Sequence, residues 1–171
     1  MADLPRCVKI DFLDKQSQRN LLDEGWREIG QLMTWRGIVD RVDSKHVKQV
    51  RGEDVVALAK EIKWSGRLWS DTLVSRRAAR EETERYLLET SDPIHKIGEV
   101  GFIVSTATRI GLIGVHPMAA GCGLAATMIR ATRPEHPSWL EAGTYYHNEA
   151  ARSLYPGIGM KLDRRELVFH K

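Results

Sequence analysis

The sequence predicts an α+β protein, with a mixed and mostly antiparallel sheet that is flanked by helices. Three observations lead to this prediction. Apolar and aromatic segments of strand length recur along the chain, amphipathic helical patterns lie between them, and no internal repeat or low-complexity segment interrupts them. The length of 171 residues suits one main domain with a short N-terminal addition, because it is too short for two full domains.

The first 47 residues are predicted to form a β-rich addition that ends in a linker. Segments 7–12 and 26–36 have the apolar and aromatic content of strands, and a short helix is expected between them. The polar and charged run 40–48 follows and suits a linker. We therefore expect residues 1–47 to be an addition to a main domain at 48–171.

Two helices are predicted early in the main domain. A short strand-like segment at 48–51 leads into 53–62, where apolar residues recur at helical spacing. The segment 75–90 is the clearer helix, because Ser75 is a favourable N-cap and strong helix formers follow it. The many charges of this second helix are expected to lie on a solvated face.

The remaining strands are predicted in the second half of the main domain. Segments 99–105 and 110–115 have strand-like content and are predicted as neighbours joined by a turn. The final segment 162–171 alternates between apolar and polar residues, which is typical of a last strand. We expect it to pair beside the strand at 139–145.

The composition fits a globular protein of the cytoplasm. Hydrophobic residues make up 42% and charged residues 29%, and no apolar run approaches the length that crosses a bilayer. The opening segment lacks a basic stretch followed by a long apolar one, so we do not expect it to act as a secretory signal. We expect a cytoplasmic protein without a membrane partner.

Cysteine content and charge indicate which ligands the protein is suited to bind. Cys7 and Cys122 are the only cysteines and have no metal-ligand spacing, so neither a zinc site nor a disulfide framework is indicated. The net charge of +3 comes from interspersed Lys and Arg, which suits an acidic small molecule. The absence of a concentrated basic stripe disfavours nucleic acid as a partner.

The most informative stretch is 109–131, RIGLIGVHPMAAGCGLAATMIRA, because a buried strand ends there in a glycine-containing loop and a helix. Pro117 cannot donate to a ladder and marks the end of the strand. Gly121 and Gly123 let the backbone approach a ligand, and the helical pattern begins at Leu124. The free amides of the first helical turn would then face an anion, for which a pyrophosphate is well suited. A tight turn without a ligand is the alternative interpretation.

A second segment follows at 142–160, AGTYYHNEAARSLYPGIGM, in which a short strand leads to Asn148, a short helix and a glycine turn. Together the two segments resemble the GNAT superfamily of acyl-CoA N-acetyltransferases. The family's motif positions fall on Ala120, Gly123, Ala125, Asn148, Ala151, Leu154-Tyr155 and Gly159-Met160. Ala120 stands where the family usually has Arg or Gln, and Met160 where it usually has Phe. The central hairpin region is also several residues shorter than in the family, so we expect one strand there to be short or missing.

The resemblance implies acetyl-CoA as the acyl donor and assigns residues to its binding. The glycine loop would hold the pyrophosphate, and the end of the preceding strand would offer main-chain groups to the pantetheine arm and the thioester carbonyl. The donor-binding residues implied in this way are Gly114, Val115, Ala120, Gly121, Cys122, Gly123, Leu124, Ala125 and Asn148. Cys122 is expected to contribute as a small loop residue and not as a nucleophile.

The resemblance also implies that Tyr155 is the general acid that protonates the departing thiolate. A phenol suits this role because its reference pKa near 10 keeps it protonated at neutral pH. Asn148 is grouped with it as a catalytic residue, since it caps the helix that carries Tyr155 or binds the donor's arm. His116 and His147 are candidates for the base, which stays unassigned.

The segment Trp64–Asp71, WSGRLWSD, is predicted to bind the acceptor through Arg67, Trp69 and Asp71, which suit ring stacking and pairing with phosphate or hydroxyls. Together with the later motifs it is similar to the dTDP-fucosamine acetyltransferases, a GNAT subgroup that acetylates a nucleotide-linked amino sugar. A core position for Trp69 is the alternative interpretation.

The leading hypothesis is therefore an enzyme that transfers an acetyl group from acetyl-CoA to the primary amine of a small molecule, with a nucleotide-linked amino sugar as the first expectation. One alternative is a GNAT-fold binding or structural module that has lost catalysis, which Ala120 and the short hairpin would permit. Another is transfer to a protein or nucleic-acid amine. A homodimer is left open.

Overall fold

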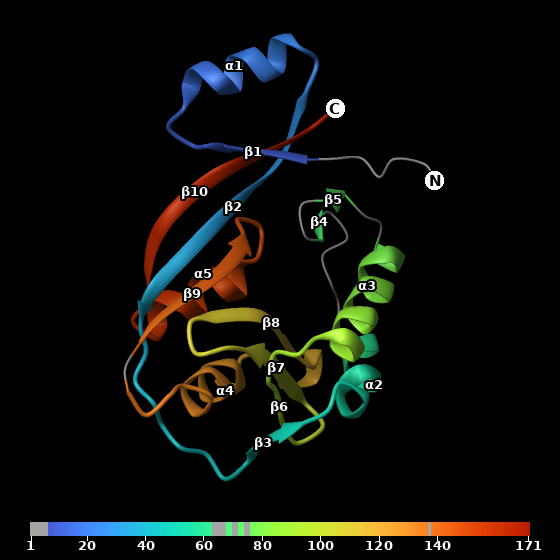
Figure 1. The fold of residues 1–171 in the computed structure, drawn as a ribbon, viewed down its shortest axis with the longest axis vertical. Helices are drawn as coiled ribbons and strands as arrows, with labels where there is room; N and C mark the ends of the chain where they lie inside the picture. Colours follow the sequence, from blue (N-terminus) through green and yellow to red (C-terminus); the bar gives the residue numbers. More distant parts are fainter. Residues whose placement is uncertain (1–6, 63–67, 70–71, 74–75, 137) are drawn as a thin grey trace.

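The computed structural model describes residues 7–62, 68–69, 72–73, 76–136 and 138–171 (Figure 1). An eight-stranded sheet has the order β1-β10-β2-β9-β8-β7-β6-β3, and β4 pairs with β5 as a separate hairpin. The strands are β1 Cys7–Asp11, β2 Arg27–Ile38, β3 Val47–Val50, β4 Leu68–Trp69, β5 Thr72–Leu73, β6 Ile94–Ile97, β7 Gly101–Ser105, β8 Arg109–Val115, β9 Trp139–Tyr145 and β10 Lys161–His170. The predicted α+β class with a mostly antiparallel sheet is confirmed, since within this sheet β8 and β9 form the parallel pair.

Helices cover both faces of the sheet. They are α1 Lys15–Asp23, α2 Glu53–Glu61, α3 Arg76–Glu89, α4 Leu124–Ala131 and α5 Glu149–Gly157, with a short 3₁₀ turn at Pro117–Ala119. Apolar residues of α2 and α3 pack on Phe102 and Val104 on one face, while α4 and α5 pack on Ile103 and Ala142 on the other. Helix α1 stands at the β1 end of the sheet (Figure 1). No helix in the described part of the chain is long and apolar enough to span a membrane.

The N-terminal segment is built into the same sheet as the rest of the chain. Strand β2 lies between β9 and β10, where Leu32–Ile38 pairs with Trp139–Tyr145 on one side and Arg27–Arg36 with β10 on the other. The prediction that the last strand pairs beside 139–145 is therefore wrong. Strand β2 takes that place because its twelve residues offer two hydrogen-bonding edges and bury Met33 and Trp35 in the core.

Strand β6 was not predicted as a separate strand. It has four residues and pairs with both β3 and β7. The region that we expected to be short or to lack a strand therefore holds a short one. Its ends, Ile94 and Ile97, are buried, whereas the two residues between them are half-buried, so alternation over so few residues gives a weak sequence signal.

Gly37 of β2 fixes how closely α5 approaches the sheet. A Cβ atom at this position would lie 2.9 Å from the Cα of Met160 and 3.0 Å from the carbonyl oxygen of Gly159. Because Gly37 has no side chain, the turn after α5 can rest directly on the backbone of β2. This contact positions α5, which carries Tyr155, against the strand that the N-terminal segment supplies.

Arg133 joins the end of α4 to the turn between β7 and β8. Its side chain is only 2% exposed. The guanidinium donates hydrogen bonds to the carbonyl oxygens of Ile129 (3.0 Å), Ala107 (3.2 Å) and Thr106 (3.3 Å). Burial lowers the pKa of this group, so the carbonyl oxygens are needed to compensate for its lost hydration.

We expect Arg133→Ala to lower the free energy of unfolding by about 3 kcal/mol, because it removes a buried side chain together with its hydrogen bonds to three carbonyl oxygens. Urea denaturation measures this loss. Arg130→Ala on the same helix is the matched control and should cost less than about 1 kcal/mol, because Arg130 is half-buried. Equal losses for the two variants would contradict a stabilising role for the contacts that Arg133 makes between α4 and the turn after β7.

Candidate functional site

The central feature of the site is the divergence of the parallel strands β8 and β9. Their ladder joins Arg109 to Glu141 and Ile110 to Ala142 and ends there, although the strands continue to Val115 and Tyr145. Main-chain groups of the later residues that point into this gap therefore lack a strand partner across it. Such an opening suits an extended ligand that can hydrogen-bond to backbone.

A β-bulge at Gly111 explains where the strands part. Strand β7 pairs Val104 with Leu112 and Ser105 with Ile110, so Gly111 is skipped. A bulge bends its strand and increases the local twist, and this one immediately follows the last residue of β8 that pairs with β9. The divergence is thus a property of β8 itself.

Glycines on β8 let the neighbouring helices lie close to the strand. A Cβ atom at Gly111 would be 2.6 Å from the hydroxyl oxygen of Tyr86 on α3. At Gly114, a Cβ atom would be 2.6 Å from the Cδ1 of Ile62, which follows α2. Tyr86 therefore packs on the bulge, although sequence reasoning did not single it out. The only sequence signal for this contact is the presence of glycine within a buried strand.

The loop after β8 presents a helix N-terminus to solvent. Gly121 and Gly123 have φ angles of 79° and 74°, in the left-handed region that glycine adopts readily. Residues 120–123 are exposed, and no side chain caps the N-terminus of α4. The first amides of a helix have no intrahelical acceptors, so this loop offers free N–H donors at the positive end of the helix. These are the features that bind phosphate groups.

His116 anchors the start of this loop. Its amide donates to the carbonyl oxygen of Val100 at 2.7 Å, and its ring Nδ1 accepts from the amide of Met118 at 3.1 Å. The neutral ring must then carry its proton on Nε2, which lies 2.9 Å from a carboxylate oxygen of Glu61. Both ring nitrogens are engaged, so a role as base would require breaking one of these contacts.

Asn148 begins α5 and sets the position of Tyr155. The Asn148 side chain accepts a hydrogen bond from the amide of Ala151 at 3.2 Å, which is an N-cap interaction. Tyr155 is 3% exposed, and its ring lies 6.2 Å from that of Trp35. It belongs to the same core cluster as Ile110 and Ala142, the last residues to pair before the gap. Burial raises the pKa of Tyr155 to about 12, so the phenol is protonated at neutral pH.

Several solved structures with this arrangement of elements are named as acetyltransferases. A GCN5-related N-acetyltransferase from Sphaerobacter thermophilus has a TM-score of 0.63 at 15% identity and covers 100% of this chain and 61% of its own. A GNAT-family acetyltransferase from Colwellia psychrerythraea has a TM-score of 0.60 at 12% identity, over 96% of this chain and 64% of its own. A tandem GNAT protein from the clavulanic acid biosynthesis pathway has a TM-score of 0.58 at 12% identity, over 96% and 62%. The fold is that of the GNAT acetyltransferases.

This chain spans less than two thirds of the length of each of these GNAT structures. No protein-family model matches its sequence, and no curated protein matches it either. At such low identity the likeness establishes the fold, while the reaction and the acceptor are argued from the residues of the site.

The structure describes little of the predicted acceptor residues. Arg67 and Asp71 are outside the described residues, and Trp69 is described only through the backbone of β4. The prediction of an acceptor site at 64–71 therefore stays a prediction.

His147 is the other candidate base. Its ring stacks on that of Tyr145 at the end of β9, with ring centroids 5.8 Å apart.

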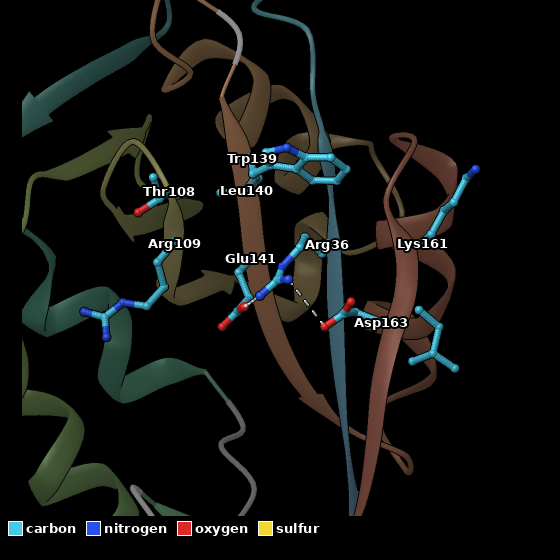
Figure 2. A pocket seen from close by; sticks show the side chains of 9 residues that line it. Arg36, Thr108, Arg109, Trp139, Leu140, Glu141, Lys161 and Asp163 are labelled. Atoms are coloured by element: carbon cyan, nitrogen blue, oxygen red, sulfur yellow. Dashed lines mark hydrogen bonds and ion pairs between the residues drawn. The ribbon is translucent and has the colours of Figure 1, made fainter.

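Sequence reasoning missed a cavity of about 730 Å³ at the other end of the sheet, near the beginnings of β8, β9 and β10 (Figure 2). Arg36 of β2 points into it, donates to Glu141 at 2.7 Å and lies 3.8 Å from Asp163. The hydrogen bond to Glu141 raises the pKa of this guanidinium. Trp139 lines the same cavity (Figure 2). Because these residues come from strands far apart in the sequence, local patterns do not reveal the cavity.

The raised pKa of Tyr155 predicts a loss of stability at alkaline pH. The pKa is about 12 in the folded protein against a reference of 10.0, so folding favours the neutral phenol. This contribution is complete below pH 10 and disappears as the pH rises from 10 to 12. Over that range, wild type should lose up to about 3 kcal/mol more unfolding free energy than Tyr155→Phe. Urea denaturation across the pH series measures the difference, and identical slopes would contradict the burial of the phenol.

Proposed function

We propose that this protein is an acyl-CoA-dependent N-acetyltransferase that transfers an acetyl group from acetyl-CoA to the primary amine of a small molecule. The observation that carries the proposal is the gap between β8 and β9, which leads directly to the uncapped N-terminus of α4. A pyrophosphate and an extended amide-containing arm are the two parts of a CoA thioester that these features suit. The GNAT fold supports the same conclusion.

The residues present fit acetyl-CoA. The amides of Gly121 and of 123–125 offer donors to its pyrophosphate, and the backbone of Gly114 and Val115 borders the gap for its arm. When bound, acetyl-CoA supplies an activated acyl carbon. The backbone of β8 would orient that carbon, and the core side chains beneath the gap would exclude water from it.

Tyr155 is proposed as the proton donor. During transfer a carbon–nitrogen bond forms and the carbon–sulfur bond breaks, while the amine nitrogen releases a proton to solvent and the sulfur accepts one from the general acid. With a pKa of about 12, Tyr155 keeps its proton until negative charge develops on the sulfur. Asn148 acts as a positioning residue, because its cap on Ala151 fixes the helix that carries Tyr155.

For the acceptor we propose a nucleotide-linked amino sugar. Support comes from the aromatic and charged residues Arg67, Trp69 and Asp71, and from the likeness of their segment to the dTDP-fucosamine acetyltransferases. An aromatic ring suits stacking on a base, and an arginine suits a phosphate. A panel of amines that includes nucleotide-linked amino sugars, simple amino sugars, peptides and polyamines tests this class directly.

A binding module without catalysis is the competing candidate. Ala120 favours it, because this exposed position lacks the Arg or Gln side chain that the family uses there. The two candidates differ in donor binding and in turnover, since a degenerate module neither binds acetyl-CoA at high micromolar concentration nor acetylates an amine of the panel.

We expect Gly123→Val to weaken the binding of acetyl-CoA at least about tenfold, because a side chain would block close approach to the loop. Isothermal titration calorimetry measures the affinity. Gly25→Val is the matched control: Gly25 has a φ of 84°, and, as at Gly123, nothing lies within 4 Å of a Cβ there. It lies in the turn after α1 and should bind acetyl-CoA as wild type does. Equal affinities for both variants would remove the loop from the donor site, and no binding to wild type would overturn the function.

We expect Tyr155→Phe to lower kcat by about 10²-fold with little change in KM for acetyl-CoA, because the ring is kept and only the proton donor is lost. Steady-state kinetics with an acceptor from the panel measures both constants. Tyr146→Phe, at a 46% exposed position just before α5, is the control and should keep the wild-type rate. A Tyr155→Phe rate close to wild type at saturating acetyl-CoA would exclude Tyr155 as the acid.

A further inference from the structure

A second cavity of about 380 Å³ adjoins the glycine loop. One wall is the connector between β2 and β3, and the other is the outer side of α4. Its lining residues are Val42, Asp43, Ser44, Gly123, Ala126, Thr127 and Arg130. Gly123 belongs both to this lining and to the loop proposed to bind the pyrophosphate. The cavity is therefore continuous with the proposed donor site, and its volume falls within the range of small-molecule sites.

Hydrogen bonds hold the connector in place on α4. The amide of Val42 donates to the carbonyl oxygen of Arg130 at 3.4 Å. The guanidinium of Arg41 donates to the carbonyl oxygen of Arg133 at 3.2 Å. Arg41 also pairs with the carboxylate of Asp43 at 2.7 Å. Asp43 is the one acidic side chain in the lining of the cavity. Its pairing with Arg41 offsets its negative charge, so the carboxylate repels an anion in the cavity less strongly.

Arg130 is the cationic residue of the lining, and its position suits a phosphate. It is half-buried, and among the described residues its guanidinium makes no hydrogen bond or ion pair. At about 1.5 Å per residue, its Cα lies roughly 10 Å along the helix from Gly123. Helical side chains lean toward the N-terminus, so an arginine at this position can extend along the helix toward the loop.

We propose that this cavity binds the adenosine end of the acyl-CoA donor and that Arg130 holds its 3′-phosphate. The inference rests on the proposed function. In coenzyme A the ribose that carries the 3′-phosphate is attached to the pyrophosphate, so a pyrophosphate at Gly123 brings this dianionic group to the cavity. Arginine binds phosphate through charge-assisted, bidentate hydrogen bonds. Arg130 thereby supplies a cation to a donor site that lacks one at Ala120, and the connector from the N-terminal segment completes the site.

Calorimetry with CoA and 3′-dephospho-CoA tests the proposal, because the two ligands differ only in the 3′-phosphate. Wild type should bind CoA at least about tenfold more tightly than 3′-dephospho-CoA. Arg130→Gln should reduce this ratio to about twofold or less and leave the affinity for 3′-dephospho-CoA unchanged. Arg80→Gln, an exposed position on α3 with the same change of charge, is the control and should keep the wild-type ratio.

The outcomes separate this inference from the function on which it rests. Equal binding of both ligands to wild type, or a wild-type ratio in Arg130→Gln, would overturn the assignment of the 3′-phosphate while leaving acyl-CoA as the donor. If the ratio falls equally in Arg130→Gln and Arg80→Gln, the preference reflects overall charge and the cavity is not the site. If neither ligand binds to wild type, the proposed function itself fails, and the inference fails with it.

Discussion

The break in the β8–β9 ladder is the constraint on which the rest of the site depends. A parallel pair that continued to the ends of both strands would satisfy its own backbone groups and leave no space between them. The bulge at Gly111 prevents this, because it turns β8 away immediately after Ile110. Tyr86 and Ile62 pack against the glycines of β8 and hold this distorted strand from the opposite face. The gap is therefore supported by packed side chains on a rigid sheet.

The two helices beside the gap play different parts. Helix α4 offers its uncapped N-terminus to solvent, where an anion can be bound through amides that have no other partner. Helix α5 is capped by Asn148 and buries Tyr155 against Trp35. Burial costs the phenol its hydration, which raises its pKa and keeps the proton in place at neutral pH. One helix thus suits binding, and the other suits proton transfer.

The N-terminal segment contributes to the site through its strand and its connector. Strand β2 supplies Trp35 to the surroundings of Tyr155, and Gly37 lets the turn after α5 rest on the sheet. The connector then crosses to α4 and is fixed there through Val42 and Arg41. Two arginines near the end of α4 have different environments as a result. Arg133 is buried and bonded to carbonyl oxygens, whereas Arg130 lines a cavity that is open to a ligand.

Local sequence patterns determined most of the elements and the glycine loop at 120–123. The buried strand before Pro117, the glycines at 121 and 123, and the cap at Asn148 act over a few residues, so their effects on the backbone can be read from the chain. Tertiary structure decided the pairing of β10 with β2, the short strand β6, the contact of Tyr86 with Gly111 and the cavity beside Arg130. Each of these joins residues that are distant in sequence. Such contacts are selected by how whole faces pack and which strand edges remain free, and neither property is written in a local pattern.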